Sequence, residues 1–251
     1  MSISQPVGLY LAVPFCKAKC SFCNFASDAF APQRMDAYVG RLCAEVAAAG
    51  EKARGLGAYP GVAADSIYFG GGTPSLLHPE HFRKIFAAVR DAFDVTSNAE
   101  ATTECAPGQL ADATLEELLR QGVNRISLGV QSFIDREASA VGRLHTGEQC
   151  EGEIERLQRA GVSDIGLDLI AGLPHQTEDS WRESLERTIA SGVRHVSIYM
   201  LEVDEDSRLG REVIKGGVRY GAQAVPDEDR AAAFYEMGCE VLGAAGIEQY
   251  E

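Results

Sequence analysis

Near its start the chain reads Pro14-Phe15-Cys16-Lys17-Ala18-Lys19-Cys20-Ser21-Phe22-Cys23-Asn24-Phe25, which spaces three cysteines as C-x3-C-x2-C. Three thiolates on one short loop can each bind one iron of a cubane [4Fe–4S] cluster, and the fourth iron then stays open to a small chelating molecule. A structural zinc site would need a fourth protein ligand, and the sequence has no second C-x2-C and no H-x3-5-H pair. The spacing therefore favours an iron–sulfur cluster on Cys16, Cys20 and Cys23.

The composition is that of an acidic globular protein. The chain has 251 residues, of which 45% are hydrophobic and 24% charged, and its net charge is −14. Length alone allows one or two domains. A surface this acidic disfavours nucleic acid and anionic membranes as partners. The sequence opens on no secretory signal, and no apolar run approaches the ~20 residues that cross a bilayer.

The cysteine count indicates the compartment. Seven cysteines, with three of them crowded together, are not the pattern of a disulfide framework. We interpret the dispersed Cys43, Cys105, Cys150 and Cys239 as buried, inert thiols. A reducing cytoplasm is the expected location, and it also suits an oxygen-sensitive cluster.

Short strand-like runs alternate with amphipathic helical stretches along the chain. We expect strands at residues 8–14, 66–69, 100–105, 125–130, 164–170 and 195–201. We expect helices at residues 33–49, 80–93, 112–121, 147–160, 178–190 and 227–245, and residues 246–251 look like the beginning of a seventh strand. Six strand–helix units in series predict a parallel sheet with right-handed crossovers. An open doubly wound sheet and a partial barrel both fit this pattern.

Several residues at the expected strand ends could bind a ligand. Gly70-Gly71-Gly72-Thr73-Pro74 directly follows a strand, where glycines allow close backbone approach and N–H groups that point at a ligand; a tight turn is the alternative. Glu104 and Gln131 end the next two strands; by themselves they are interpreted as a solvated carboxylate and as a side chain that satisfies a nearby loop. Asp168 lies in an otherwise apolar strand, so it needs a basic partner or a ligand. Arg143 by itself would be read as a surface ion pair.

The cysteine stretch resembles the signature of radical S-adenosylmethionine (SAM) proteins. Tyr10-x3-Pro14-Phe15-Cys16 and Tyr68-Phe69-Gly70-Gly71-Gly72-Thr73-Pro74 resemble the branch that holds the oxygen-independent coproporphyrinogen III oxidases and the HemW-type heme chaperones. The resemblance runs from about Leu9 to the last residue. It implies a partial (β/α)6 TIM-like barrel, in which the chemistry gathers at the C-terminal ends of the strands. It also implies a radical SAM core at residues 1–225 and the start of an incomplete C-terminal region at residues 226–251, so the chain looks truncated.

The resemblance also implies which residues contact SAM. The glycine motif would bind the amino group of SAM, Glu104 would lie by its ribose, and Arg143 would pair with its carboxylate. The full set of expected contacts is Tyr10, Phe22, Gly71, Gly72, Thr73, Glu104, Gln131, Arg143 and Asp168. For Tyr10 and Phe22, core packing is the alternative to a contact with the adenine or methionyl group. No catalytic residue is assigned, and His145 is interpreted as structural.

The chain departs from the resembled pattern at three positions. Ala12 stands where relatives often have His, and Ala106 where they often have Asn. The oxidases continue the motif as C-x3-C-x2-C-x-C, but the residue at that last position is Phe25, which favours a heme chaperone over the decarboxylating oxidase. A radical SAM methyltransferase is the third alternative, and whether the protein is an enzyme stays open. The expected partners are heme or a porphyrin, an electron donor such as flavodoxin or ferredoxin, and a heme-acceptor protein.

Overall fold

The computed structural model describes residues 6–29, 33–55 and 63–250. Its contacts divide the chain into two compact units. Unit 1 comprises Met1–Lys17, Ser27–Cys105 and Gln109–Ile126, and unit 2 comprises Ala18–Ala26, Ala106–Gly108 and Ser127–Glu251. Each unit is described by itself below.

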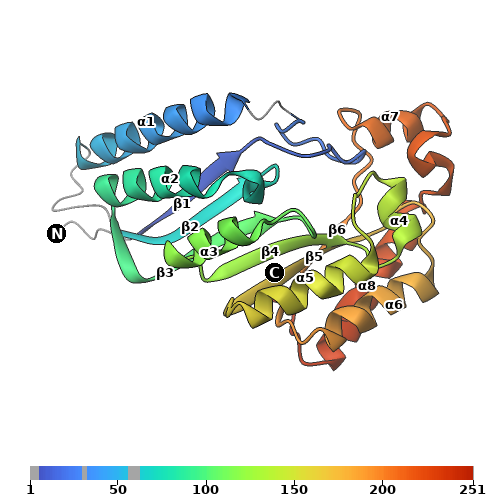
Figure 1. The fold of residues 1–251 in the computed structure, drawn as a ribbon. Coiled ribbons are helices and arrows are strands. Elements are labelled where there is room, and N and C mark those ends of the chain that lie inside the picture. Colours follow the sequence, from blue (N-terminus) through green and yellow to red (C-terminus); the bar gives the residue numbers. More distant parts are fainter. Residues whose placement is uncertain (1–5, 30–32, 56–62, 251) are drawn as a thin grey trace. The chain divides into compact units, whose positions relative to one another are not determined.

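The strands follow one another in the sheet in the order in which they occur in the chain, β1-β2-β3-β4-β5-β6 (Figure 1). The pairs β1–β2, β2–β3 and β5–β6 are parallel. A doubly wound sheet would reverse its strand order at a switch point, and this order has no such reversal. Since β1 and β6 do not pair within the described residues, the fold is the expected partial barrel. The strands are β1 (Val7–Val13), β2 (Ala63–Gly71), β3 (Asp94–Cys105), β4 (Arg125–Gln131), β5 (Asp164–Ala171) and β6 (His195–Met200).

In unit 1, helices α1 (Gln33–Gly55) and α2 (Pro79–Ala92) lie side by side (Figure 1). The core forms because α2 presents apolar residues at helical spacing, as its sequence predicts. Phe82 and Phe86 are buried, and their rings lie 5.4 and 5.3 Å from the ring of Phe69 in β2. The unit also contains α3 (Asp112–Arg120) and the short 3-10 helix η1 (Pro74–Leu76).

In unit 2, hydroxyl and carboxylate side chains cap the long helices. Thr146 caps α5 (Gly147–Arg159), Thr177 caps α6 (Glu178–Ala190) and Asp227 caps α8 (Glu228–Ala244). The fully buried Trp181 ties α6 to α8, because its Nε1 donates to the carbonyl oxygen of Phe234 at 2.6 Å. Three short helices complete the unit: α4 (Asp135–Ala140), α7 (Arg208–Ile214) and the 3-10 helix η2 (Arg219–Ala224).

The six expected strands and six expected helices are confirmed, with differences at some ends. Strand β3 begins at Asp94, and its pairing with β2 is irregular between Ala64 and Ser66. The seventh strand is wrong for the described residues 246–250, which form no ladder. Gly246 has φ 85, and Ile247 N donates to the carbonyl oxygen of Leu242 at 2.9 Å. These residues therefore close α8 with a glycine C-cap. No helix in the described part of the chain has the length and apolarity that a membrane crossing requires.

Candidate functional site

The cysteine loop is closed at its base in unit 1. Cys16 N donates to the carbonyl oxygen of Asp28 at 3.0 Å, and Asp28 N donates to that of Pro14 at 3.0 Å. Further along the loop, Cys23 N donates to the carbonyl oxygen of Cys20 at 3.2 Å, which forms a turn in unit 2. All seven cysteines lie in the described part of the chain, and none of them forms a disulfide; Cys20 is buried, whereas Cys16 and Cys23 are half-buried. The three thiols of the motif are thus available as ligands.

In unit 2 the loop is held by two distant segments. Ser21 N donates to the carbonyl oxygen of Val141 at 2.9 Å, and the carbonyl oxygen of Ser21 accepts from Leu209 N in α7 at 2.8 Å. The guanidinium of Arg208 donates to the carbonyl oxygen of Lys19. Phe22 packs against an apolar cluster, so core packing accounts for part of its ring. That cluster is Val141, Ile170, Leu173, Leu209 and Ala222.

Arg143 contacts the cysteine loop, whereas the sequence alone suggested a surface ion pair. Its Nη1 lies 3.3 Å from Cys20 Sγ, and its Nη2 donates to the carbonyl oxygen of Gly129 in β4. Its Nε is buried and has no hydrogen-bond partner among the described residues. A half-buried guanidinium with an unused donor is suited to a carboxylate ligand.

Gln131 and His145 follow the end of β4 in unit 2. Gln131 has φ 68, and a non-glycine residue in the left-handed region is a strained position of the kind found at ligand sites. His145 Nε2 donates to the carbonyl oxygen of Val130 at 3.0 Å. Burial, and then the charge of Arg143, lower the pKa of His145 to about 4. His145 is therefore neutral near pH 7.

Asp168 has a hydroxyl partner. The Oγ of Ser127 in unit 2 lies 3.2 and 3.1 Å from the two carboxylate oxygens of Asp168. A hydrogen bond from a hydroxyl gives the half-buried carboxylate of Asp168 a polar partner within the protein.

In unit 1, Glu104 links the glycine motif to a pair of aromatic rings. Its Oε1 accepts from the hydroxyl of Tyr68 at 2.9 Å, and its Oε2 accepts from Gly71 N at 3.0 Å. The rings of Tyr68 and Tyr10 stack with centroids 5.7 Å apart. Burial, and then the negative charge of Glu104, raise the pKa of Tyr10. Unit 1 thus brings together the expected contacts Tyr10, Gly71 and Glu104.

The glycine motif uses its N–H groups inside the protein. Gly71 N donates to Glu104, Gly72 N to the carbonyl oxygen of Val13 at 2.8 Å, and Thr73 N to that of Phe15 at 2.7 Å. The expectation that these N–H groups point at a ligand is therefore wrong, because protein acceptors already occupy them. A motif with occupied donors and an adjacent carboxylate suits a cationic group, such as an amino group, better than a phosphate.

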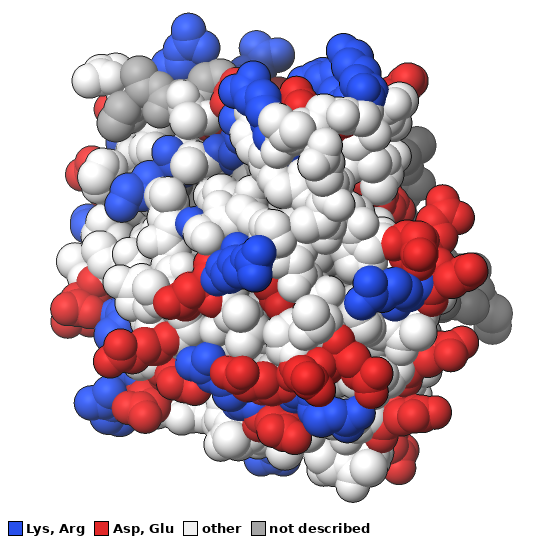
Figure 2. Space-filling view, turned by 90° about the vertical axis from the view of Figure 1, so that its right-hand side faces the viewer, with Lys and Arg blue, Asp and Glu red and all other residues white. Residues whose placement is uncertain are grey.

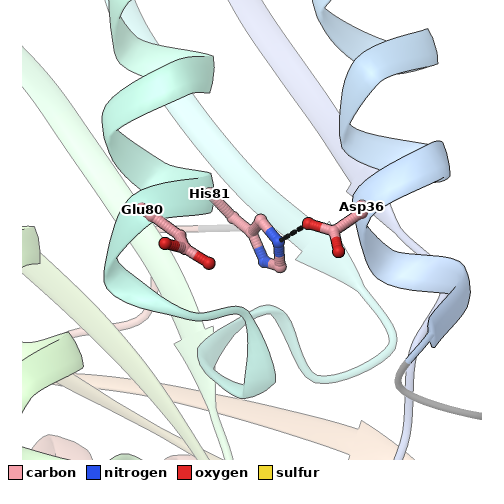
Figure 3. Close-up of side chains that lie close together, drawn as sticks. All are labelled: Asp36, Glu80 and His81. Carbon is pink, nitrogen blue, oxygen red and sulfur yellow. Dashed lines mark hydrogen bonds and ion pairs between the residues drawn. The ribbon is translucent and has the colours of Figure 1, made fainter.

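Sequence reasoning missed a group of ionisable side chains on α1 and α2. Asp36, Glu80 and His81 place their ligand atoms within 4.8 Å of one another (Figure 3). Nδ1 of His81 accepts from His78 N at 3.3 Å, so Nε2 carries the proton and donates to Asp36 at 2.9 Å. This bond holds the pKa of Asp36 below its usual value. Since both ring nitrogens are used, His81 joins two helices and offers no lone pair to a metal.

A cavity of about 500 Å³ opens in unit 1 at the beginning of β3. Its lining includes Arg90, Asp94 and Thr96, and none of the expected site residues. Arg90 is already bonded to the side chain and the carbonyl oxygen of Gln121, at 2.6 and 2.7 Å. On the face drawn in Figure 2, basic side chains are scattered among acidic and uncharged ones, unlike the basic stripe of a nucleic-acid-binding surface.

Comparison with known proteins yields a family and several relatives. The model of the radical SAM superfamily matches residues 10–188. The heme chaperone HemW of Synechocystis is 33% identical over 98% of this chain and 58% of its own length. The heme chaperone HemW of Lactococcus lactis is 33% identical over 99% of this chain and 62% of its own length. The chain therefore spans about three fifths of the length of these relatives.

A solved structure has the same fold. The coproporphyrinogen III oxidase HemN of Escherichia coli superposes with a TM-score of 0.84 over 96% of this chain and 53% of its own, at 23% identity. At this identity the likeness establishes the fold, and the reaction has to be argued from the residues.

Proposed function

Because the chain belongs to the radical SAM superfamily, we propose that it is the radical SAM part of a heme chaperone, which binds heme and passes it to an acceptor protein. The observation that carries this proposal is the 33% identity, over nearly the whole chain, to proteins named heme chaperone HemW. Phe25 supports it, since the resembled oxidases have a fourth cysteine at this position. The Phe25 side chain is exposed, so packing in a core does not account for a phenylalanine at this position.

A radical SAM domain in general carries a [4Fe–4S] cluster and binds SAM. We assign the cluster to Cys16, Cys20 and Cys23. Thiolates are the usual ligands of such clusters, and the unpartnered Ser21 Oγ and Arg143 Nε are buried polar atoms that a bound group would satisfy. When bound, the cluster supplies one electron for the reductive cleavage of SAM.

The proposed SAM contacts differ in what each can offer. The carboxylate of Glu104 accepts hydrogen bonds, the guanidinium of Arg143 matches a carboxylate, and the strained Gln131 offers an amide whose side chain makes no hydrogen bond among the described residues. Tyr10 has an exposed ring that can stack on a base. The remaining contacts are proposed on the resemblance: Phe22, Gly71, Gly72, Thr73 and Asp168.

The proposed partners follow from this chemistry. A low-potential electron donor of the flavodoxin or ferredoxin type would reduce the cluster, and a heme-binding protein would accept the cargo. The lack of disulfides among the described cysteines and the proposed cluster fit a reducing compartment, for which we propose the cytoplasm. We further propose that residues 226–251 begin a C-terminal region that contributes to heme binding.

The test uses the complete protein, reconstituted anaerobically, because this chain spans about three fifths of its relatives. With heme added, we expect a Soret band that persists through gel filtration. With SAM, a reductant and coproporphyrinogen III, we expect no protoporphyrinogen IX. The variant Phe25→Cys is the matched control, because it supplies the missing thiol without altering the other three. Release of carbon dioxide from the propionates by the wild-type protein, dependent on SAM, would replace the chaperone by the oxidase.

A further inference from the structure

Arg143 makes two bonds that a purely SAM-binding arginine would not need. Nη1 lies 3.3 Å from Cys20 Sγ, and Nη2 donates to the carbonyl oxygen of Gly129. The second bond anchors the guanidinium to the backbone of β4, and the first directs an N–H at a sulfur. A planar guanidinium has five donors in a fixed fork, so these two bonds leave further N–H groups for a ligand.

Within the described part of the chain, the charge of Arg143 has no carboxylate counter-ion: its side chain contacts only Cys20 Sγ and the carbonyl oxygen of Gly129. Its positive charge acts on its surroundings, since it contributes to the lowered pKa of His145. A half-buried cation is costly unless an anion accompanies it. The sulfur of Cys20 is the nearest group that becomes anionic on binding iron, because metal-bound cysteine is a thiolate.

We propose that Arg143 has a positioning role toward the cluster, in addition to its proposed contact with SAM: it donates a hydrogen bond to the cluster-bound sulfur of Cys20 and raises the reduction potential of the cluster. This inference rests on the assignment of Cys20 as a cluster ligand under the proposed function.

The direction of the effect follows from charge. In the reduction step the cluster gains one electron from a low-potential one-electron donor, and no bond is formed or broken. Hydrogen bonds and positive charge near the sulfurs stabilise the more negative, reduced cluster more than the oxidised one. Removal of the Arg143 guanidinium should therefore make the cluster harder to reduce.

The experiment is a redox titration of the reconstituted protein, followed by the electron paramagnetic resonance of the reduced cluster. SAM is left out, so that the contact of Arg143 with SAM cannot contribute. For Arg143→Met we expect an about tenfold lower ratio of reduced to oxidised cluster at a fixed potential, which is about 59 mV for a one-electron couple. Arg143→Lys keeps the positive charge but lacks the planar guanidinium with its several N–H donors. The reduction potential of its cluster should lie between those of Arg143→Met and the wild type.

The matched control is Arg136→Met. Arg136 lies in α4, and its guanidinium contacts Nδ1 of His175 at 3.2 Å rather than the cysteine loop. The control removes a charge of the same type from the same unit and should keep the wild-type potential. A potential in Arg143→Met equal to that of the wild type, at full iron content, would overturn the role of Arg143.

Two further measurements separate the possible failures. Iron and sulfide are determined on every sample, and a wild type without a four-iron cluster would refute the cluster assignment itself. If Arg143→Met cannot hold the cluster, pulsed resonance spectra of the wild type in H2O and D2O decide the question. They should show the signal of an exchangeable proton that is coupled to the reduced cluster. This proton signal should be weaker in Arg143→Lys. An identical proton signal in both proteins would overturn the inference.

Discussion

The amide nitrogen of Leu209 donates to the carbonyl oxygen of Ser21 at 2.8 Å, and this bond joins α7 to the middle of the cysteine loop. The neighbouring Arg208 donates to the carbonyl oxygen of Lys19, and its guanidinium lies 5.4 Å from the centre of the Tyr220 ring. The loop of Cys20 and Cys23 therefore owes part of its shape to a helix whose Arg208 follows Lys19 by 189 positions in the sequence.

Removal of the Arg208 side chain should loosen the cysteine loop. Arg208→Ala loses a charged hydrogen bond and a cation–π contact, together worth about 1–3 kcal/mol. We expect the reconstituted variant to release iron to a chelator several-fold faster than the wild type. Arg211→Ala, in the same helix, is the control, and an equal release rate for the two variants would contradict a specific role of Arg208.

The three motif cysteines should each be required for the cluster. After anaerobic reconstitution the wild type should hold about four irons and about four sulfides. We expect Cys16→Ala, Cys20→Ala and Cys23→Ala to lose this content, because each removes the only protein ligand of one iron. Cys43→Ala, Cys105→Ala and Cys239→Ala should retain it. A full cluster in Cys20→Ala would remove the basis of the assignment.

Substitution of Glu104 should weaken SAM binding and leave the cluster intact. Glu104→Gln removes the charged carboxylate that accepts hydrogen bonds from Tyr68 and Gly71. A hydrogen bond to a charged group is worth about 1.5–3 kcal/mol. We expect SAM to bind about tenfold or more weakly in isothermal titration of the reconstituted protein. Glu100→Gln, earlier in the same strand, is the control. Unchanged affinity in Glu104→Gln would remove Glu104 from the SAM site.

Gly72 should not tolerate a side chain. A Cβ at this position would lie 2.6 Å from the carbonyl oxygen of Phe15 and 2.8 Å from that of Val13, so backbone next to Cys16 has to move. We expect Gly72→Ala to lower the free energy of unfolding by about 1–3 kcal/mol and to reduce iron content. In Gly40→Ala, within α1, a new Cβ meets nothing within 4 Å, and Ala favours a helix over Gly by about 1 kcal/mol. This control should therefore lose no stability and should keep the iron content of the wild type.

The buried His145 should make the stability of the metal-free protein depend on pH. Its pKa falls from 6.5 to about 4 on folding, so between these values the unfolded chain binds more protons. The contribution of the neutral His145 to the free energy of unfolding is complete above pH 6.5. As the pH falls toward 4, the free energy of unfolding drops by up to about 3 kcal/mol. Urea unfolding should show this loss in the wild type and not in His145→Gln. The exposed His78→Gln is the control, and the same pH dependence in His145→Gln would contradict the assignment to His145.

The sequence predicts those elements whose cause is local. Helix α2 was expected because Phe82, Ile85, Phe86 and Val89 recur at helical spacing, and all four are buried. Helix α7 was not expected, because its seven residues carry too little periodicity. Its first turn is capped by Ser207 and bonded to Ser21, and such a distant partner cannot be read from the local sequence.

In the candidate site, too, features with a local cause could be predicted from the sequence, and features that depend on distant partners could not. The motif cysteines could be selected by their spacing, Glu104 by its place at a strand end, and Asp168 as a carboxylate within an otherwise apolar strand. Their bonding partners could not be predicted, since these depend on register and side-chain rotamers. For the glycine motif, the sequence leaves open whether the N–H groups point at a ligand or belong to a tight turn, and only the structure shows that Glu104, Val13 and Phe15 accept them.

The bond between Arg208 and Lys19 spans 189 positions of the chain, which has a consequence for synthesis on the ribosome. At about 5–20 residues per second, roughly 10 to 40 s pass between the emergence of the two partners. During that interval, α7, which binds the segment of Cys20 and Cys23, has not yet been synthesised. A shaped cysteine loop therefore forms only after α7 has been synthesised, and machinery that delivers iron and sulfide meets it only then.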